Sequence, residues 1–185
     1  MTGNLSLEEI NDRLLDATNE FVGYSLDIDE KIFFEQPAAK WSIAQNVQHL
    51  IISAKRTKLA YSLPKFIIKL YVGKPNRSSR TYDELVEKYK LRLKEGGRAT
   101  TTFIPKPIPS TVGKLKMLQG FSKSMTHLSE TITNKWTDKK LDLYIAPHPL
   151  LGKITLRELC YFTIHHTYHH LETIKTRLQE LEAVK

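Results

Sequence analysis

The chain has 185 residues, of which 41% are hydrophobic and 26% are charged, a balance typical of a folded globular protein. This length allows a substantial hydrophobic core, so we expect residues 1–185 to form a single domain. The one cysteine, Cys160, excludes an intramolecular disulfide and fits a reducing compartment. No stretch resembles a secretory signal or a membrane span, and we therefore expect a cytoplasmic protein.

The formal charge of +8 raises the question of nucleic acid, an anionic membrane or an acidic ligand as partner. The lysines and arginines are scattered from Arg13 to Lys185 instead of forming one run. Dispersed positive charge is typical of a solvated surface, so we predict no nucleic-acid partner.

Four predicted helices begin with the same signature, in which Ser or Thr is followed three residues later by Glu or Gln. In such a capping box the two side chains satisfy free backbone N–H groups at the helix start. The pairs are Ser6 with Glu9, Ser42 with Gln45, Thr81 with Glu84, and Thr155 with Glu158. Apolar residues at helical spacing predict helices over residues 7–24, from 42 to about Pro64, over 82–94, over 115–132 and over 156–181.

The segment between the second and third main helices holds two further features. The minor helix over 82–94 ends at Gly96-Gly97. Within residues 101–110 prolines alternate with other residues, which predicts an extended connector. Residues 141–145 alternate between apolar and polar side chains only briefly, and this run is too short to seed a sheet. The fold class predicted is all-α, a four-helix bundle with the minor helix and the connector as an insertion.

Four of the seven histidines fall within residues 165–170, where two pairs have i, i+4 spacing. Residues four apart lie one turn apart on one helix face, close enough to bind one metal ion. From the centre of this helix's apolar stripe, His170 lies about 60° and His166 about 100° away. His165 and His169 lie about 160° away, toward solvent. We therefore predict that His166 and His170 are the ligands.

A third ligand would come from a facing helix, and His49, within VQHLII of the second helix, is the best candidate. It lies about 130° from the main apolar centre of that helix, so spacing alone leaves its role open. For the four-histidine cluster, the alternative is a polar helix face with a pH-dependent charge. His127 and His148 are expected to be surface or hydrogen-bonded residues.

Two segments resemble motifs of the DinB-like four-helix-bundle metalloproteins. WSIAQNVQHL, residues 41–50, resembles the second-helix motif, and HPLLGKITLRELCYFTIHHTYHHLETI, residues 148–174, resembles the last-helix motif. The histidine triad of that family falls on His49, His166 and His170. The resemblance thus implies a divalent metal, Zn or Ni, at these three residues.

Three neutral imidazoles leave at least one metal position open for water or substrate. The resemblance implies a thiol-dependent transferase or isomerase, in which a low-molecular-weight thiol is activated to attack an electrophile, as in detoxification. A metal-dependent hydrolase that uses a metal-bound water is the alternative. A small-molecule substrate is expected in either case, and a homodimer is left open.

Other candidate pocket residues are few. Gln45 and Arg56 share the helix face of His49, and Arg56 could hold a substrate carboxylate. Tyr168 could donate a proton. Surface and packing roles are the alternatives for these residues. Cys160 lies on an apolar stripe and is predicted to be an inert core thiol.

The segment SLPKFIIKLYVGKPNR, residues 62–77, interleaves basic with apolar residues. This pattern raises a third function, a non-enzymatic module that binds a membrane or a partner. We favour a helix that covers the bundle with its lysines in water, and so expect no membrane contact.

Overall fold

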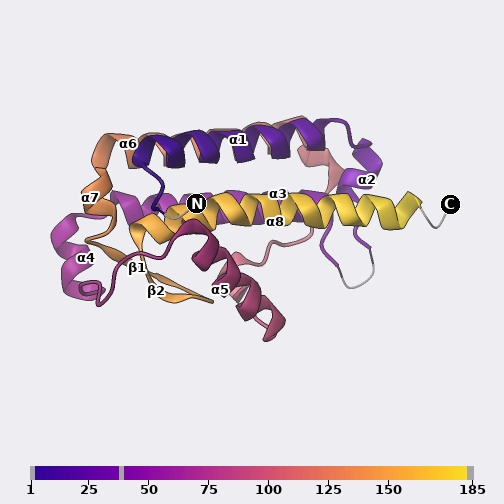
Figure 1. Ribbon diagram of the computed structural model, residues 1–185. Helices are drawn as coiled ribbons and strands as arrows, with labels where there is room; N and C mark the ends of the chain where they lie inside the picture. The colour runs from indigo at the N-terminus through magenta and orange to yellow at the C-terminus, as the bar shows by residue number, and fades with distance from the viewer. Residues whose placement is uncertain (1–2, 38–39, 183–185) are drawn as a thin grey trace.

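The computed structural model describes residues 3–37 and 40–182 and is mainly helical (Figure 1). Its elements are α1 (Leu7–Leu26), α2 (Glu30–Phe34), α3 (Ile43–Ser62), α4 (Lys65–Tyr71), α5 (Tyr82–Lys94), α6 (Lys114–Lys135), α7 (Asp138–Leu141), β1 (Ile145–His148), β2 (Gly152–Thr155) and α8 (Leu156–Glu182).

The four long helices α1, α3, α6 and α8 form a bundle (Figure 1). Helix α1 packs against α6 and α8, and α3 packs against the same two helices. Between them lies one apolar core, in which Phe21 of α1 meets Phe121 of α6 edge to face at 5.1 Å. The predicted all-α four-helix bundle is therefore confirmed, and the minor helix α5 packs outside it, against α8.

The helix boundaries follow the local sequence signals. All four predicted capping boxes form, each with two hydrogen bonds between the cap residue and the residue three positions later. Helix α3 ends at Ser62, two residues before Pro64, as proline requires. After α5, Gly96 adopts a φ of 88°, a backbone conformation that glycine reaches without steric cost.

The prediction that residues 141–145 cannot seed a sheet is incomplete, because Ile145, the last of them, begins the first strand of a small hairpin. Strands β1 and β2 pair antiparallel, with Ile145 opposite Thr155 and His148 opposite Gly152. An isolated hairpin is marginal in water, but this one packs Ile154 into the core and contacts α8. The local sequence pattern does not contain that tertiary support.

Helix α4 meets our expectation for residues 62–77 only in part. Phe66, Leu70 and Tyr71 are 70–79% exposed, whereas Ile68 is buried. The ammonium groups of Lys65 and Lys69 lie over the rings of Trp136 and Tyr144, at 5.0 and 5.1 Å. Lys69 is exposed and Lys65 is half-buried, so the lysines meet water as expected, but most of the large apolar side chains point outward as well. No helix in the described part of the chain is long and apolar enough to cross a membrane.

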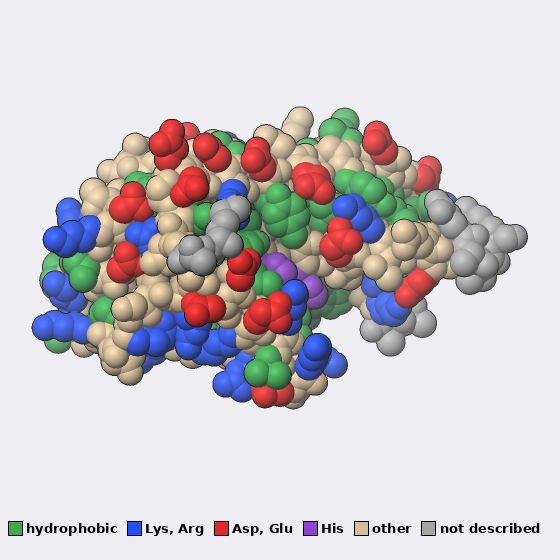
Figure 2. Space-filling view, viewed as in Figure 1, with side chains coloured by type: hydrophobic (Ala, Val, Ile, Leu, Met, Phe, Trp, Pro, Cys, Tyr) green, Lys and Arg blue, Asp and Glu red, His purple; other side chains and the backbone are tan. Residues whose placement is uncertain are grey.

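Charge is distributed unevenly over the surface (Figure 2). Acidic side chains gather over α1, whereas lysines and arginines gather around α4. Beneath this surface, the fully buried carboxylate of Glu158 binds Arg77 at 2.8 and 2.9 Å and Arg80 at 3.1 Å. Burial alone would raise the pKa of Glu158, but these hydrogen bonds lower it below its ordinary value. The ion pairs hold the chain before α5 against the start of α8, which places α5 beside the histidine face.

Candidate metal centre

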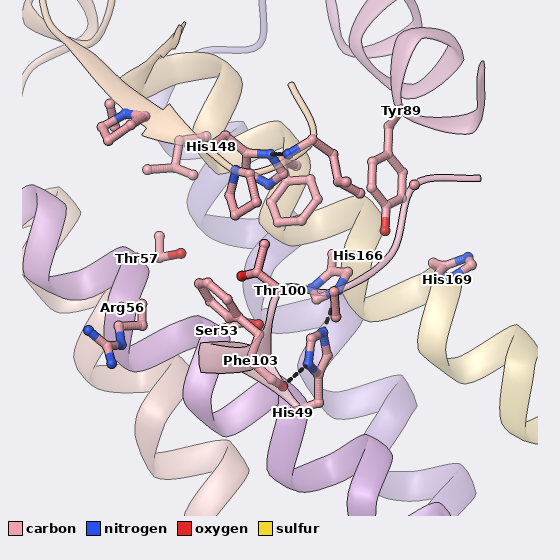
Figure 3. A pocket seen from close by; sticks show the side chains of 18 of the residues that line it. His49, Ser53, Arg56, Thr57, Tyr89, Thr100, Phe103, His148, His166 and His169 are labelled. Carbon is pink, nitrogen blue, oxygen red and sulfur yellow. Dashed lines mark hydrogen bonds between the residues drawn. The ribbon is translucent and has the colours of Figure 1, made fainter. Parts of the chain in front are cut away.

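Three imidazoles from two helices converge inside the bundle, and Figure 3 shows two of them, those of His49 and His166. The Nε2 atom of His166 lies 3.1 Å from Nε2 of His49 on α3 and 3.1 Å from Nε2 of His170 on its own helix. All three rings are buried, and one ligand atom from each lies within 4.8 Å of the others. The three residues that the sequence singles out therefore form a group that could hold a metal ion.

Hydrogen bonds fix the tautomers of His49 and His170. Nδ1 of His49 lies 2.8 Å from the carbonyl oxygen of Phe103, which can only accept, so this nitrogen carries the proton. Nδ1 of His170 lies 2.7 Å from Oδ1 of Asn46. The amide of Asn46 is oriented by its own Nδ2, which donates to the carbonyl of Ser42 at 2.8 Å. Both histidines thus aim an unprotonated Nε2 at His166.

This arrangement is electrostatically incomplete without a cation. One proton on Nε2 of His166 can serve only one of its two 3.1 Å contacts. The lone pair at the other contact then faces a nitrogen that has no proton to offer it. If Nδ1 of His166 carries the proton instead, both contacts set two nitrogen lone pairs face to face. A divalent cation resolves the conflict, because every lone pair then points at positive charge.

The spacing and protonation of the group also suit a metal. Metal–nitrogen bonds of about 2.05 Å in a tetrahedral zinc site separate the ligand nitrogens by about 3.3 Å. The observed 3.1 Å contacts are close to this value. Burial lowers the pKa of His166 and His170 well below the ordinary value, and the neighbouring imidazoles lower both further. The pKa of His49 is also lowered, mainly by burial, so all three rings are neutral at neutral pH, the form that a metal requires.

Aromatic rings enclose the group on two sides. The indole of Trp41, at the start of α3, stacks on His170 with an interplanar angle of 4° and lies 5.1 Å from the ring of His49. Phe162 stacks on His166 at 4.8 Å, one turn earlier on α8. These contacts restrict the orientation of the imidazoles and exclude water from their flanks.

A cavity of about 570 Å³ opens onto all three histidines. Its walls come from α3, α5, residues 97–103, the hairpin and α8 (Figure 3). The lining is mostly apolar, with Leu63, Leu93, Leu150 and Leu159 among its residues. Arg56 and Arg98 line it too, but no aspartate or glutamate of the described chain does. The space therefore favours an apolar or anionic ligand.

The remaining histidines of the cluster are less exposed than predicted. His165 and His169 are half-buried, because α5 covers their face and places the Tyr89 ring 5.8 and 5.9 Å from theirs.

His148 is hydrogen-bonded, as expected, through Nδ1, which accepts from the N–H groups of Leu150 and Leu151. It nevertheless lines the cavity instead of the open surface, and burial lowers its pKa to about 4. His127 is exposed.

The weaker candidates lie in three different places. Gln45 is buried and serves the helix start, where its Oε1 accepts from Ser42 and its Nε2 donates to the carbonyl of Pro105 at 3.3 Å. Arg56 is exposed and lines the cavity apart from the triad (Figure 3). The pKa of Tyr168 is raised, first by burial and then by acidic residues of α1, so this side chain faces α1 and not the cavity. Cys160 is fully buried with its pKa raised to about 12, as an inert core thiol should be.

Two partners of the triad were missed by the sequence reasoning. Asn46 lies three residues before His49, so helical spacing already places both on one face of α3. That signal could have identified it. The acceptor from Phe103 is a backbone carbonyl, which any residue type supplies, so the sequence carries no mark of it.

Comparison with known proteins tests the resemblance. No curated protein and no solved structure matches the chain. A family model described as the DinB superfamily, however, matches residues 7–174, which include both histidine motifs and all four bundle helices up to Ile174. The chain therefore belongs to the DinB superfamily.

Proposed function

We propose that the chain is a metal-dependent enzyme that binds one divalent cation, Zn or Ni, through His49, His166 and His170. We further propose that it activates a low-molecular-weight thiol for transfer or isomerisation. The observation that carries this proposal is the convergence of three Nε2 atoms, 3.1 Å apart across two contacts, at one wall of an apolar cavity. A cavity of this volume lies in the range of small-molecule sites.

When bound, the cation would act as a Lewis acid that lowers the pKa of a thiol or a water beside it. The protein's own contribution is to hold three neutral imidazoles with their lone pairs inward. Asn46 and the Phe103 carbonyl fix two of those rings through Nδ1. Trp41 and Phe162 keep water from the flanks.

Two features favour a thiol over water as the activated group. The cavity offers no carboxylate among the described residues, whereas metal-dependent hydrolases commonly use a glutamate as general base. The other imidazoles on its wall are weak bases, since burial lowers the pKa of His148 to about 4 and also lowers that of His169. A thiolate needs no such base once its proton is lost, and soft sulfur ligands suit zinc.

The test is turnover of small electrophiles by zinc- or nickel-loaded protein with and without added thiols. The proposal expects product only when a thiol and the metal are both present, and none with the His166→Ala variant. Hydrolysis that proceeds at the same rate without thiol would support the water-based alternative and contradict thiol activation.

A further inference from the structure

A second cavity, of about 580 Å³, adjoins the triad at His170. It shares Trp41, His169 and His170 with the first cavity. Its further lining consists of polar residues from the start of α3 and the last turns of α8: Lys40, Asn46, Glu172, Thr173, Thr176, Arg177 and Glu180. This second space is therefore polar and charged where the first is apolar.

Arg177 is the unusual residue in this cavity. Its side chain is buried, with only 8% of the residue exposed, and its Nε and Nη1 atoms have no hydrogen-bond partner among the described residues. Burial lowers the pKa of Arg177, and the charge of Glu180 opposes this only in part. The hydrogen bonds of the two nearby carboxylates go to other residues. Glu180 binds Lys40 at 3.0 Å, and Glu172 binds Lys175 at 2.8 Å.

Buried polar nitrogens in proteins are nearly always hydrogen-bonded, so two guanidinium nitrogens without a partner among the described residues indicate that a ligand is missing. The planar fork of Arg177 fits the two oxygens of a carboxylate or a phosphate. We propose that the second cavity is an anion subsite in which Arg177 binds a carboxylate or phosphate of the same ligand whose thiol reaches the histidine triad. This inference rests on the proposed function and names the ligand class: an elongated, anionic thiol.

The geometry of α8 suits such a ligand. Arg177 follows His170 by seven residues, which is nearly two full turns, so both lie on one face about 10 Å apart along the axis. Trp41, His169 and His170 line both cavities, so a ligand that reaches both ends would pass alongside these side chains. A small thiol such as 2-mercaptoethanol is too short to touch both.

Cobalt-loaded protein allows binding to be followed without turnover, by the absorption that a thiolate produces on Co²⁺. Three probes separate the cases: glutathione carries carboxylates, coenzyme A carries phosphates, and 2-mercaptoethanol carries neither. We expect Arg177→Met to weaken binding of one of the charged thiols by about tenfold to hundredfold, the value of a charged hydrogen bond, and to leave 2-mercaptoethanol unchanged. The charged thiol that responds identifies the anion.

Arg56→Met is the matched control, because this second arginine lines the first cavity and is exposed. Equal affinity of both charged thiols for wild type and Arg177→Met would overturn the proposal. So would a loss confined to Arg56→Met. If no thiol at all, 2-mercaptoethanol included, gives the absorption, the proposed function fails instead.

The anion subsite remains testable in that case through thermal stability. Glutarate or inorganic phosphate at constant ionic strength should raise the Tm of the metal-loaded wild type, since a ligand that binds only the folded state stabilises it. The same anions should leave the Tm of Arg177→Met unchanged. Without anion, this variant should melt no lower than wild type, because it loses two buried nitrogens that have no hydrogen-bond partner among the described residues. A marked fall in its Tm, or an equal anion effect in both proteins, would contradict the subsite.

Discussion

Helix α8 carries two histidine pairs with identical spacing, and the structure treats them differently. His166 and His170 face α3, where His49 supplies a third imidazole and Asn46 supplies an acceptor. His165 and His169 face α5, where the ring of Tyr89 offers packing without an acceptor in the ring plane. The i, i+4 spacing thus provides candidate chelates, and the facing helix decides which pair can bind a metal.

The largest effect should come from removing any member of the triad. Replacing His49, His166 or His170 by Ala leaves two imidazoles, and metal affinity should fall by more than the tenfold to hundredfold typical of losing an outer-shell partner. Elemental analysis after dialysis checks this. Wild-type protein should retain close to one metal per chain, and retention by all three variants would contradict the assignment.

Asn46 should have the next largest effect, because it fixes the ring of His170 without touching the cation. Asn46→Ala should weaken metal binding by about tenfold to hundredfold, measured by competition with a chelator. Asn46→Asp keeps an acceptor and should retain most of the affinity. Gln48→Ala, a neighbouring amide on α3, is the control that should bind as wild type does.

A smaller effect concerns proton binding instead of metal binding, and it involves His165, a member of the pair that faces α5. Burial, followed by the charges of His169 and Lys90, lowers the pKa of His165 from 6.5 to about 4. Between these values the unfolded chain binds a proton that the folded chain does not. The free energy of unfolding should therefore decrease as the pH falls through this window, by less than about 1.4 kcal/mol per pH unit, since part of the ring meets solvent.

His165→Gln should reduce this dependence. Denaturant unfolding of the metal-free protein on both sides of the window checks it, with the difference between variant and wild type as the readout. Identical pH dependence of the two proteins would show that His165 titrates normally in the folded state.

The smallest effect expected is on metal content when the α5-facing pair is removed. His165→Ala and His169→Ala should keep close to one metal per chain, because neither imidazole belongs to the converging group. Loss of the metal from either variant would show that the two pairs are not separate.

The comparison also shows how far the sequence leads. Capping boxes and apolar spacing located the four long helices, because both signals act within one or two turns. The apolar stripe of α8 is also a local signal, and it correctly distinguished the buried His166 from His165. The lysines of α4 lie over the rings of Trp136 and Tyr144, and the burial of His165 depends on α5. Those contacts arise between distant segments, and local patterns do not encode them.

X-ray absorption at the metal edge of zinc-loaded protein tests the central claim most directly. The predicted result is three imidazole nitrogens at about 2.0–2.1 Å, together with one oxygen ligand from solvent or one sulfur ligand from a thiol. The imidazole count should fall in His49→Ala and stay at three in His165→Ala. A spectrum without imidazole scattering, or one that His49→Ala leaves unchanged, would contradict a metal centre shared between α3 and α8.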